Sequence, residues 1–369
     1  MDADEHRPTG PLRRGWTTGA CATAATKAAC QALLGGGFPD PVEITLPRGQ
    51  RPAFALSTER LGDGEASAGI VKDAGDDPDV THGALVVSTV RRGAPGTGVT
   101  FRAGPGVGTV TLPGLPLPVG EPAINPVPRR MMTEVVTAMA MRFGVKPDVV
   151  VEISVRDGEA LARKTWNPRL GIVGGLSILG TTGIVIPYSC SAWIDSIHRG
   201  VDVARALGTG HVAGCTGSTS EAAVQSRYGL ADPAMLDMGD FAGGLLKYIR
   251  AHPVPWLTIG GGFAKLSKLA QGHLDLHSGR SQVDMDWLAA RMVECGASPS
   301  VATEAGAART ALEVLDLARA AGVPIADAVA RAARSTAIGV LGDVPVVVDV
   351  IVVDREGEII AESGIVPPT

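Results

Sequence analysis

Four carboxylates and one lysine crowd into a single short turn of this chain, the segment KDAGDDPDVT at residues 72–81. Like charges this close repel and raise one another's pKa, so the arrangement usually persists because a cation, a proton or a substrate group resolves it. Three explanations are open: a bound metal ion, acid–base chemistry, or a solvated hairpin loop built from turn-forming residues. The pattern of a calcium-binding loop is not met, because Pro78 interrupts the carboxylates. We therefore expect no structural calcium site.

Two adjacent arginines, Arg129 and Arg130, begin a predicted helix that runs to Arg142. Cations at a helix N-terminus are unfavourable by roughly 0.3–1 kcal/mol at exposed positions, because the macrodipole favours acids there. An anion that bridges both guanidinium groups and the free backbone amides would remove this conflict. The long Pro-rich segment 104–128 before the helix predicts an irregular loop with a functional role.

The tripeptide Thr-Thr-Gly occurs twice. Thr17-Thr18-Gly19 opens an alanine-rich helix, and Thr181-Thr182-Gly183 follows a glycine-rich segment. Both copies lie where a loop changes into regular structure, so their hydroxyls and amides could face an anionic ligand. A chance repeat and simple close packing of the alanines are the alternatives.

In the second half of the chain, three apolar strands each end in a glycine-containing turn before a helix: 211–218, 235–241 and 256–262. This alternation predicts a parallel sheet whose helix N-termini converge at one edge, where ligands bind in such folds. No single turn has the G-x-G-x-x-G or P-loop pattern, so a nucleotide site cannot be inferred from any one of them.

Other patterns that could carry chemistry are weaker. His273 and His277 are four residues apart, but without a convincing helix or a third ligand they do not predict a metal site, and His277 fits a polar loop that faces substrate. The serine of Gly217-Ser218-Thr219-Ser220 does not satisfy G-x-S-x-G, so a hydrolase nucleophile is not expected. We interpret Cys21 and Cys215 as small buried residues.

The elements that must position these residues fall into two domains with a boundary near Pro187. The chain has 369 residues, enough for two cores. Residues 42–110 alternate in the manner of short strands, and the terminal strands near 346–361 resemble that region. We therefore predict an α/β protein with three parts: a disordered tail at 1–11, an α+β substrate-binding domain at 12–186 and 340–369, and a Rossmann-like domain with a parallel sheet at 187–339.

Composition excludes several classes of protein. The formal net charge is −5 with no basic domain, which argues against nucleic-acid binding. The five cysteines include no C-x-x-C pair, which indicates a reducing compartment. No apolar run approaches the ~20 residues of a membrane span, and no signal peptide is evident, so we expect a cytoplasmic protein, with homo-oligomerisation left open.

Several long segments, in order, resemble the CbiD family of cobalamin biosynthesis. They are LRRGWTTGACATAATKAA, VKDAGDDPDVTHG, GVGTVTLPGLPLPVGEPAINPVPRRMM, NPRLGIVGGLSILGTTGIV and GHLDLHSGRSQVD. The resemblance runs from about Leu12 to the C-terminal strands. It implies a methyltransferase that uses S-adenosyl-L-methionine as co-substrate and methylates C-1 of cobalt-precorrin-5B, an anionic tetrapyrrole that brings its own cobalt.

With that resemblance, the candidate residues acquire roles. The carboxylates would accept a proton from the macrocycle or balance developing charge: Asp73, Asp76 and Asp77. The glycine turns would hold the methyl donor: Gly214, Thr216, Gly217, Ser218, Gly239, Asp240, Gly260, Gly261 and Gly262. The substrate's carboxylates would be received by Thr17, Thr18, Lys72, Arg129, Arg130, Thr181, Thr182 and His277. Donor and acceptor would meet in an interdomain cleft.

Two other functions remain open at this stage. A nicotinamide-dependent oxidoreductase would use the same glycine turns but needs an acidic ribose partner, and Glu221 lies too close to its turn for that role. A non-catalytic tetrapyrrole carrier would bind the macrocycle without consuming a methyl donor. A product mass with one added methyl group separates both from a methyltransferase.

Overall fold

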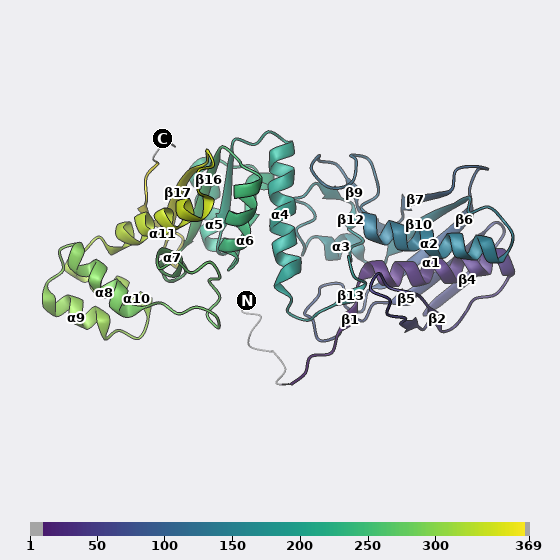
Figure 1. Cartoon of the computed structure of the whole chain (residues 1–369), viewed down its shortest axis with the longest axis horizontal. Coiled ribbons are helices and arrows are strands. Elements are labelled where there is room, and N and C mark those ends of the chain that lie inside the picture. The colour runs from purple at the N-terminus through teal and green to yellow at the C-terminus, as the bar shows by residue number, and fades with distance from the viewer. Residues whose placement is uncertain (1–9, 366–369) are drawn as a thin grey trace. The chain divides into compact units, whose positions relative to one another are not determined.

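The computed structural model describes residues 10–365 and divides into two compact units, one up to Cys190 and one from Ser191 onward. In Figure 1 the first unit is coloured purple to blue and the second teal to yellow. The observed division lies four residues after the predicted boundary at residue 186. The tail predicted at 1–11 lies largely outside the described residues. The mixture of helices with parallel and antiparallel strands confirms the predicted α/β class.

The first unit is built on a five-stranded sheet in the order β4-β5-β6-β10-β7. Four of these strands are antiparallel to their neighbours, whereas β7 runs parallel to β10. Apolar side chains alternate along the central strands, as the period of two predicts for a sheet with one buried face. The strands are β4 (Thr58–Gly62), β5 (Glu65–Val71), β6 (Leu85–Arg92), β7 (Val99–Ala103) and β10 (Val149–Val155).

Two long helices pack together in the first unit, and the first of them packs on β5 and β6. Helix α1 (Thr18–Gly35) buries a continuous stripe of alanines, whose small side chains let its backbone approach the sheet. The other helices are α2 (Pro126–Arg142) and α3 (Gly158–Ala162). Short strand pairs complete the unit: β1 (Gly15–Trp16) with β13 (Ile184–Val185), β2 (Val42–Glu43) with β3 (Ala53–Phe54), β8 (Gly106–Val107) with β12 (Gly175–Leu176), and β9 (Thr109–Val110) with β11 (Ile172–Val173).

The start of α2 differs from the prediction. The helix begins at Pro126 and not at Arg129, because Asn125 is its N-cap and proline is favoured at the first helical position. The segment 104–128 also contains the short strands β8 and β9, so it is less irregular than its prolines suggested. Arg129 and Arg130 therefore lie one turn inside the helix.

The second unit contains a five-stranded sheet in the order β15-β14-β16-β17-β18. Its first four strands are parallel, which confirms the predicted parallel sheet, and only β18 is antiparallel. Each parallel strand reads as a short, buried apolar run, as expected when helices cover both faces. The strands are β14 (His211–Cys215), β15 (Met235–Asp237), β16 (Trp256–Gly262), β17 (Val347–Val353) and β18 (Ile359–Glu362).

The placement of the last two strands corrects the predicted domains. Strand β17 pairs with β16 over seven residues, so the segment 340–369 does not return to the first unit. Its alternating pattern resembled the first region, but β17 is buried on both sides because it is a central strand. Pairing with a neighbour about 90 residues away cannot be read from the strand's own residues.

Helices cover both faces of the second sheet. Helix α5 (Ser218–Tyr228) packs on the face that carries Ala213, Cys215 and Ile351. The larger core on the other face includes residues of most remaining helices. These are α4 (Cys190–Ala206), α6 (Ala242–Ala251), α7 (Phe263–Ala270), α8 (Met285–Glu294), α9 (Pro299–Gly306), α10 (Ala311–Ala321) and α11 (Ile325–Leu341), with a 3-10 turn η1 at Asp232–Ala234. Among the described residues, no helix is both long and apolar enough to cross a membrane.

Candidate active site

The acidic segment 72–81 is held together by a buried ion pair. Lys72 is 3% exposed, and its ammonium group contacts the carboxylate of Asp79 and the hydroxyl of Thr81. Burial raises the pKa of Asp79, but Lys72 and the hydrogen bonds from Thr81 lower it by more, so this carboxylate stays ionised. Lys72, predicted to bind substrate, therefore neutralises a carboxylate of its own turn.

Asp73 forms a bidentate ion pair with Arg13, a residue 60 positions earlier in the chain. It also accepts a hydrogen bond from the Gly75 amide at 2.9 Å. The Arg13 hydrogen bond and the Gly75 amide together lower the pKa of Asp73 to about 2. A carboxylate this acidic can balance positive charge, but it is a poor base near neutral pH.

Asp76 and Asp77 tie the same turn to two other segments. The amide of Arg13 donates to Asp76 at 2.6 Å, and the amide of Tyr188 donates to Asp77 at 2.8 Å. Burial raises the pKa of Asp77, and nearby Asp79 adds to this effect. Of the three predicted catalytic carboxylates, Asp77 is the best suited to exchange a proton, because its pKa moves towards neutrality.

The two Thr-Thr-Gly copies lie side by side, since β1 pairs with β13. The amide of Thr17 donates to Gly183 at 3.0 Å, and the amide of Gly19 donates to Leu179 at 2.8 Å. The Thr17 hydroxyl caps α1 by accepting from the Ala20 amide at 3.2 Å. The expectation of several free amides at this helix start is therefore wrong: at least two of them already donate within the protein. Thr181 is exposed, and the Thr182 hydroxyl bonds Ile184.

Arg129 folds back onto the loop before its own helix. Its guanidinium donates to the carbonyls of Ile124 at 2.8 Å and Pro122 at 2.9 Å, and it pairs with Glu121 at 3.0 Å. Arg130 is more exposed and lies 3.9 Å from Glu134. The expected conflict with the macrodipole is thus resolved by loop carbonyls and Glu121, and only Arg130 keeps its guanidinium largely in solvent.

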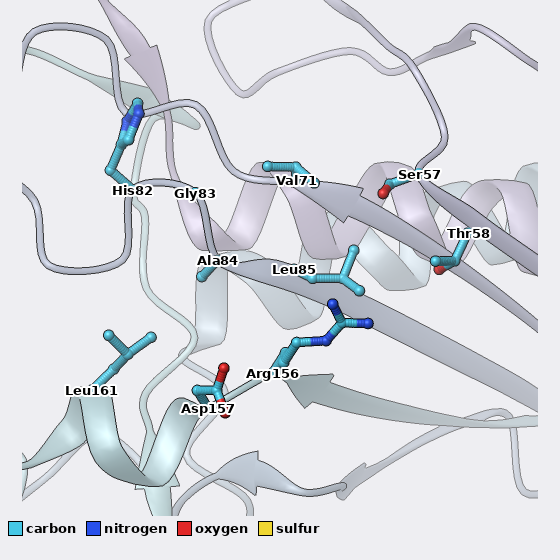
Figure 2. A pocket seen from close by; sticks show the side chains of 10 residues that line it. All are labelled: Ser57, Thr58, Val71, His82, Gly83, Ala84, Leu85, Arg156, Asp157 and Leu161. Carbon is cyan, nitrogen blue, oxygen red and sulfur yellow. The ribbon is translucent and has the colours of Figure 1, made fainter.

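A cavity of about 330 Å³ lies directly beside the acidic segment. Figure 2 shows its lining: the backbone of 82–85 on one side, and Arg156 and Asp157 at the end of β10 on the other. Arg156 is not among the residues predicted from the sequence to act at a site. The available signal was an arginine immediately after a buried strand, at the end of the sheet nearest the acidic segment.

In the second unit, the three predicted turns lie at the carboxyl ends of adjacent parallel strands. The amide of Thr216 donates to Gly260 at 2.9 Å, and the amide of Gly239 donates to Cys215 at 3.0 Å. The turns are thus joined by backbone hydrogen bonds. The prediction that they lie at one edge of a parallel sheet is confirmed.

Lys265 connects two of these turns and was missed by the sequence analysis. Its ammonium group donates to the Thr216 carbonyl at 3.0 Å and lies 3.0 Å from the carboxylate of Asp240. Lys265 is in the first turn of α7, where the macrodipole disfavours a cation. The same argument that drew attention to Arg129 could have found it.

The glycines of these turns differ in the space around them. A Cβ atom at Gly214 or Gly260 would meet side-chain atoms at 2.2 Å or 2.7 Å, so close packing accounts for these two glycines. At Gly261 a Cβ would lie 2.9 Å from Thr216. At Gly217 and Gly262 nothing lies within 4 Å, and Gly217 has an extended backbone with φ of 171°. Only these last two leave open space at a helix start for a ligand.

His277, predicted to bind substrate from a polar loop, lies in the second unit, within the domain predicted at 187–339. It follows Leu276, whose amide donates to the Asp240 carbonyl at 2.8 Å, so its loop adjoins one of the glycine turns. Among residues 10–365, no group of three His, Cys, Asp or Glu side chains is placed to hold a metal ion. Burial raises the pKa of Cys21 to about 12, in agreement with a structural thiol.

Comparisons with known proteins agree over nearly the whole chain. The CbiD family model matches residues 5–187, and the CbiD C-terminal domain matches residues 275–364. The chain is 64% identical to the cobalt-precorrin-5B C(1)-methyltransferase of Paramagnetospirillum magneticum, with 95% of this chain and 98% of that protein covered. It is 63% identical to the protein of the same name from Rhodospirillum rubrum, with 98% and 99% covered. It is also similar to a crystal structure of the cobalamin biosynthesis protein CbiD from Archaeoglobus fulgidus, at 28% identity over 69% of this chain and 78% of that one, with a TM-score of 0.39.

Proposed function

This chain belongs to the CbiD family, and on that premise we propose that it transfers a methyl group from S-adenosylmethionine to C-1 of cobalt-precorrin-5B, giving cobalt-precorrin-6A. The chain is a methyltransferase of cobalamin biosynthesis, as its relatives are named. The observation that carries the assignment of parts is the pair of open glycine positions, Gly217 and Gly262, at the carboxyl edge of the second unit's parallel sheet.

We assign the methyl donor to this edge. The amides that begin α5 and α7 and the ammonium group of Lys265 suit the donor's carboxylate, because helix N-termini and cations both attract anions. The carboxylate of Asp240 suits a ribose hydroxyl. The tightly packed Gly214, Gly260 and Gly261 hold the turns in place and do not themselves need to touch the donor.

We assign the tetrapyrrole to the first unit. Lys72 and Arg129 are engaged within the protein, so they shape the wall of the site and leave the direct contacts to other groups. Arg130 and Thr181 are exposed and remain candidates for the substrate's carboxylates. Thr17, Thr18 and Thr182 would support this surface through the β1–β13 pair. The cobalt arrives with the substrate, so the protein needs no metal of its own.

The main contribution of the protein to this reaction is to align the methyl donor with C-1 of the tetrapyrrole. When bound, S-adenosylmethionine supplies a methyl group whose bond to sulfur breaks as a bond to C-1 forms. Two reactants held in line react as fast as if one of them were present at a very high concentration, because effective molarities reach about 10⁵–10⁸ M. Transfer of a methyl cation adds one positive charge to the product unless a proton leaves. Asp77, with its raised pKa, is suited to accept that proton, while Asp73 stays negative and balances charge.

The test is to incubate the purified full-length protein with S-adenosylmethionine and cobalt-precorrin-5B under reducing conditions. We expect the tetrapyrrole to gain the mass of one methyl group and an equal amount of S-adenosylhomocysteine to form. A change in nicotinamide absorbance would instead support an oxidoreductase. Binding of the tetrapyrrole without consumption of the donor would support a carrier. Either result would overturn the assignment.

A further inference from the structure

The cavity beside the acidic segment is lined by more polar than apolar surface. Leu85, Leu161 and the half-exposed Val71 contribute the apolar surface, and the hydroxyl residues Ser57 and Thr58 lie at the end near β4 and β5. Figure 2 shows these side chains around one hollow, with Arg156 rising into it from the end of β10. Such a combination suits an organic group that carries a charge at one end.

Arg156 is fixed at its backbone but not paired at its side chain. Its amide donates to the Leu85 carbonyl at 3.0 Å, which extends the β6–β10 ladder by one residue and holds the arginine in place. Within residues 10–365, no carboxylate pairs with its guanidinium, whereas Arg13, Arg91 and Arg129 in the same unit all have carboxylate partners. An arginine that faces a cavity without a partner is prepared to receive an anion.

The other charges around the cavity restrict where an anion can bind. Asp157 follows Arg156 directly, and Figure 2 shows the Arg156 guanidinium directed away from it, towards Leu85 and Thr58. Asp157 has a left-handed backbone with φ of 57°, an uncommon conformation for a residue other than glycine, and its side chain does not cap α3. His82 lies 4.0 Å from Asp73 and accepts a hydrogen bond from the Ala74 amide. The guanidinium of Arg156 therefore attracts a carboxylate to the side of the cavity near Leu85 and Thr58, and Asp157 repels one from its own side.

We propose that this cavity is a subsite for one carboxylate side arm of the tetrapyrrole, with Arg156 as the ion partner and the hydroxyls of Ser57 and Thr58 as additional donors. Leu85, Leu161 and Val71 contact the methylene groups of the arm, and Asp157 excludes a second carboxylate. The inference rests on the proposed function, because it takes the tetrapyrrole as the ligand. It adds a specificity-determining residue, Arg156, that recognises the periphery of the substrate and not its reacting carbon.

The experiment measures equilibrium binding of cobalt-precorrin-5B to the full-length protein without methyl donor, so that no turnover occurs. We expect Arg156→Gln to weaken binding about tenfold or more, since a hydrogen-bonded charge pair is lost. Arg156→Lys keeps the charge but loses the planar fork, so its affinity should be intermediate. Added salt should weaken tetrapyrrole binding by the wild-type protein more than binding by the Arg156→Gln variant.

The matched control is Arg92→Gln, which removes one exposed arginine at the far end of β6 from the cavity. It should bind the tetrapyrrole as the wild type does. Calorimetry of S-adenosylmethionine binding should give the same affinity for all variants, and wild-type midpoints of urea unfolding show that their first unit is folded. Equal loss in Arg92→Gln and Arg156→Gln would mean that only net charge matters, and unchanged affinity in Arg156→Gln would mean that the cavity is not a subsite. In both cases methylation by the wild type would leave the proposed function intact.

Discussion

The acidic segment of the first unit and the glycine turns of the second differ in how far their polar groups are already satisfied. In the acidic segment, Lys72, Arg13 and backbone amides bind the carboxylates of residues 73–79. At the glycine turns, the backbone is joined by hydrogen bonds, but Gly217 and Gly262 leave open space at two helix starts. The crowded carboxylates of the acidic segment therefore mainly join segments of the first unit. Gly217 and Gly262 instead leave open space at helix starts.

The contrast teaches that a dense cluster of charges is not by itself evidence for a ligand. Buried polar groups are costly unless they are paired, so a cluster that folds stably tends to contain its own partners. The functional candidates are therefore groups with a further distinguishing feature: Asp77 with its raised pKa in one region, and Gly217 with open space around it in the other.

The largest effect is expected for Lys72→Met, which tests whether the charges of the acidic segment stabilise the first unit. The change leaves the largely buried carboxylate of Asp79 without its cation, and loss of one partner of such a pair costs about 3–5 kcal/mol. Urea unfolding of the full-length protein should show this as a lower midpoint for the first unit. Arg51→Met removes an exposed pair with Glu43 and should change stability by less than about 1 kcal/mol. A stable Lys72→Met protein with weakened tetrapyrrole binding would reverse our interpretation of Lys72.

The open turn is tested by Gly217→Val. Because nothing lies within 4 Å of a Cβ at this position, the side chain fits the free protein but occupies the space assigned to the donor. We expect the affinity for S-adenosylmethionine, measured by calorimetry, to fall at least a hundredfold, or about 2.7 kcal/mol. Gly210→Val, before the opposite end of β14, also places its Cβ in open space and should bind the donor normally. Unchanged affinity in Gly217→Val would remove the donor from this turn.

Asp77→Asn sharpens the division of roles within the acidic segment. A base must be ionised, so the wild-type kcat should fall as the pH decreases through the raised pKa of Asp77, which lies above the usual value of about 3.9. The Asn variant should lose tenfold or more in kcat and should lack this acidic limb. Asp76→Asn should cost less, because an amide oxygen can still accept from Arg13. A pH profile of Asp77→Asn identical to that of the wild type would exclude Asp77 as the base.

Thr17→Ala tests the structural interpretation of the Thr-Thr-Gly pair. The substitution removes the hydroxyl that caps α1, which should cost about 1 kcal/mol of stability. Thr17→Ser keeps the hydroxyl and should restore most of this loss. If Thr17→Ala instead keeps its stability and loses affinity for cobalt-precorrin-5B, the hydroxyl binds substrate.

The smallest effect is expected at the Arg13–Asp73 pair. The pKa of Asp73 in the folded protein, about 2, is below the ordinary value. The contribution of the pair to stability is therefore present above about pH 4 and is lost as the pH falls from 4 to 2. Both side chains are about half exposed, so solvent screening keeps the contribution small. The stability difference between wild type and Arg13→Gln, from urea midpoints, should therefore shrink between pH 5 and pH 2.5 and with added salt. A difference that grows in acid would contradict this assignment.

Local patterns in the sequence predicted much of the fold. The three strand–turn–helix units predicted at 211–218, 235–241 and 256–262 were placed correctly, because hydrophobic periodicity and turn chemistry act over a few residues. The start of α2 and the pairing of β17 were wrong. In the first case Asn125 and Pro126 supplied a better helix start than the arginines, and in the second the strand's neighbour lies far away in the chain.

The candidate site was predicted less completely than the fold. Residue types identified the glycine turns and the acidic segment, but not which charges were already paired. Arg129 was predicted to be a cation free for substrate and instead donates to loop carbonyls, whereas Arg156, which was not predicted, faces a cavity. Lys265 could have been predicted from the sequence, because a lysine in the first turn of a predicted helix is unfavourable and suggests a specific role.

Local sequence patterns are sufficient to identify the family, the parallel strand-turn-helix repeats of the second unit and the residue types available for chemistry. Which of those residues are free to act depends on contacts between distant segments. Arg13 meets Asp73 across 60 residues, and Tyr188 meets Asp77 across 111. A charge is satisfied by whatever folding places within about 3 Å of it, and such long-range partners leave no periodic mark on either segment.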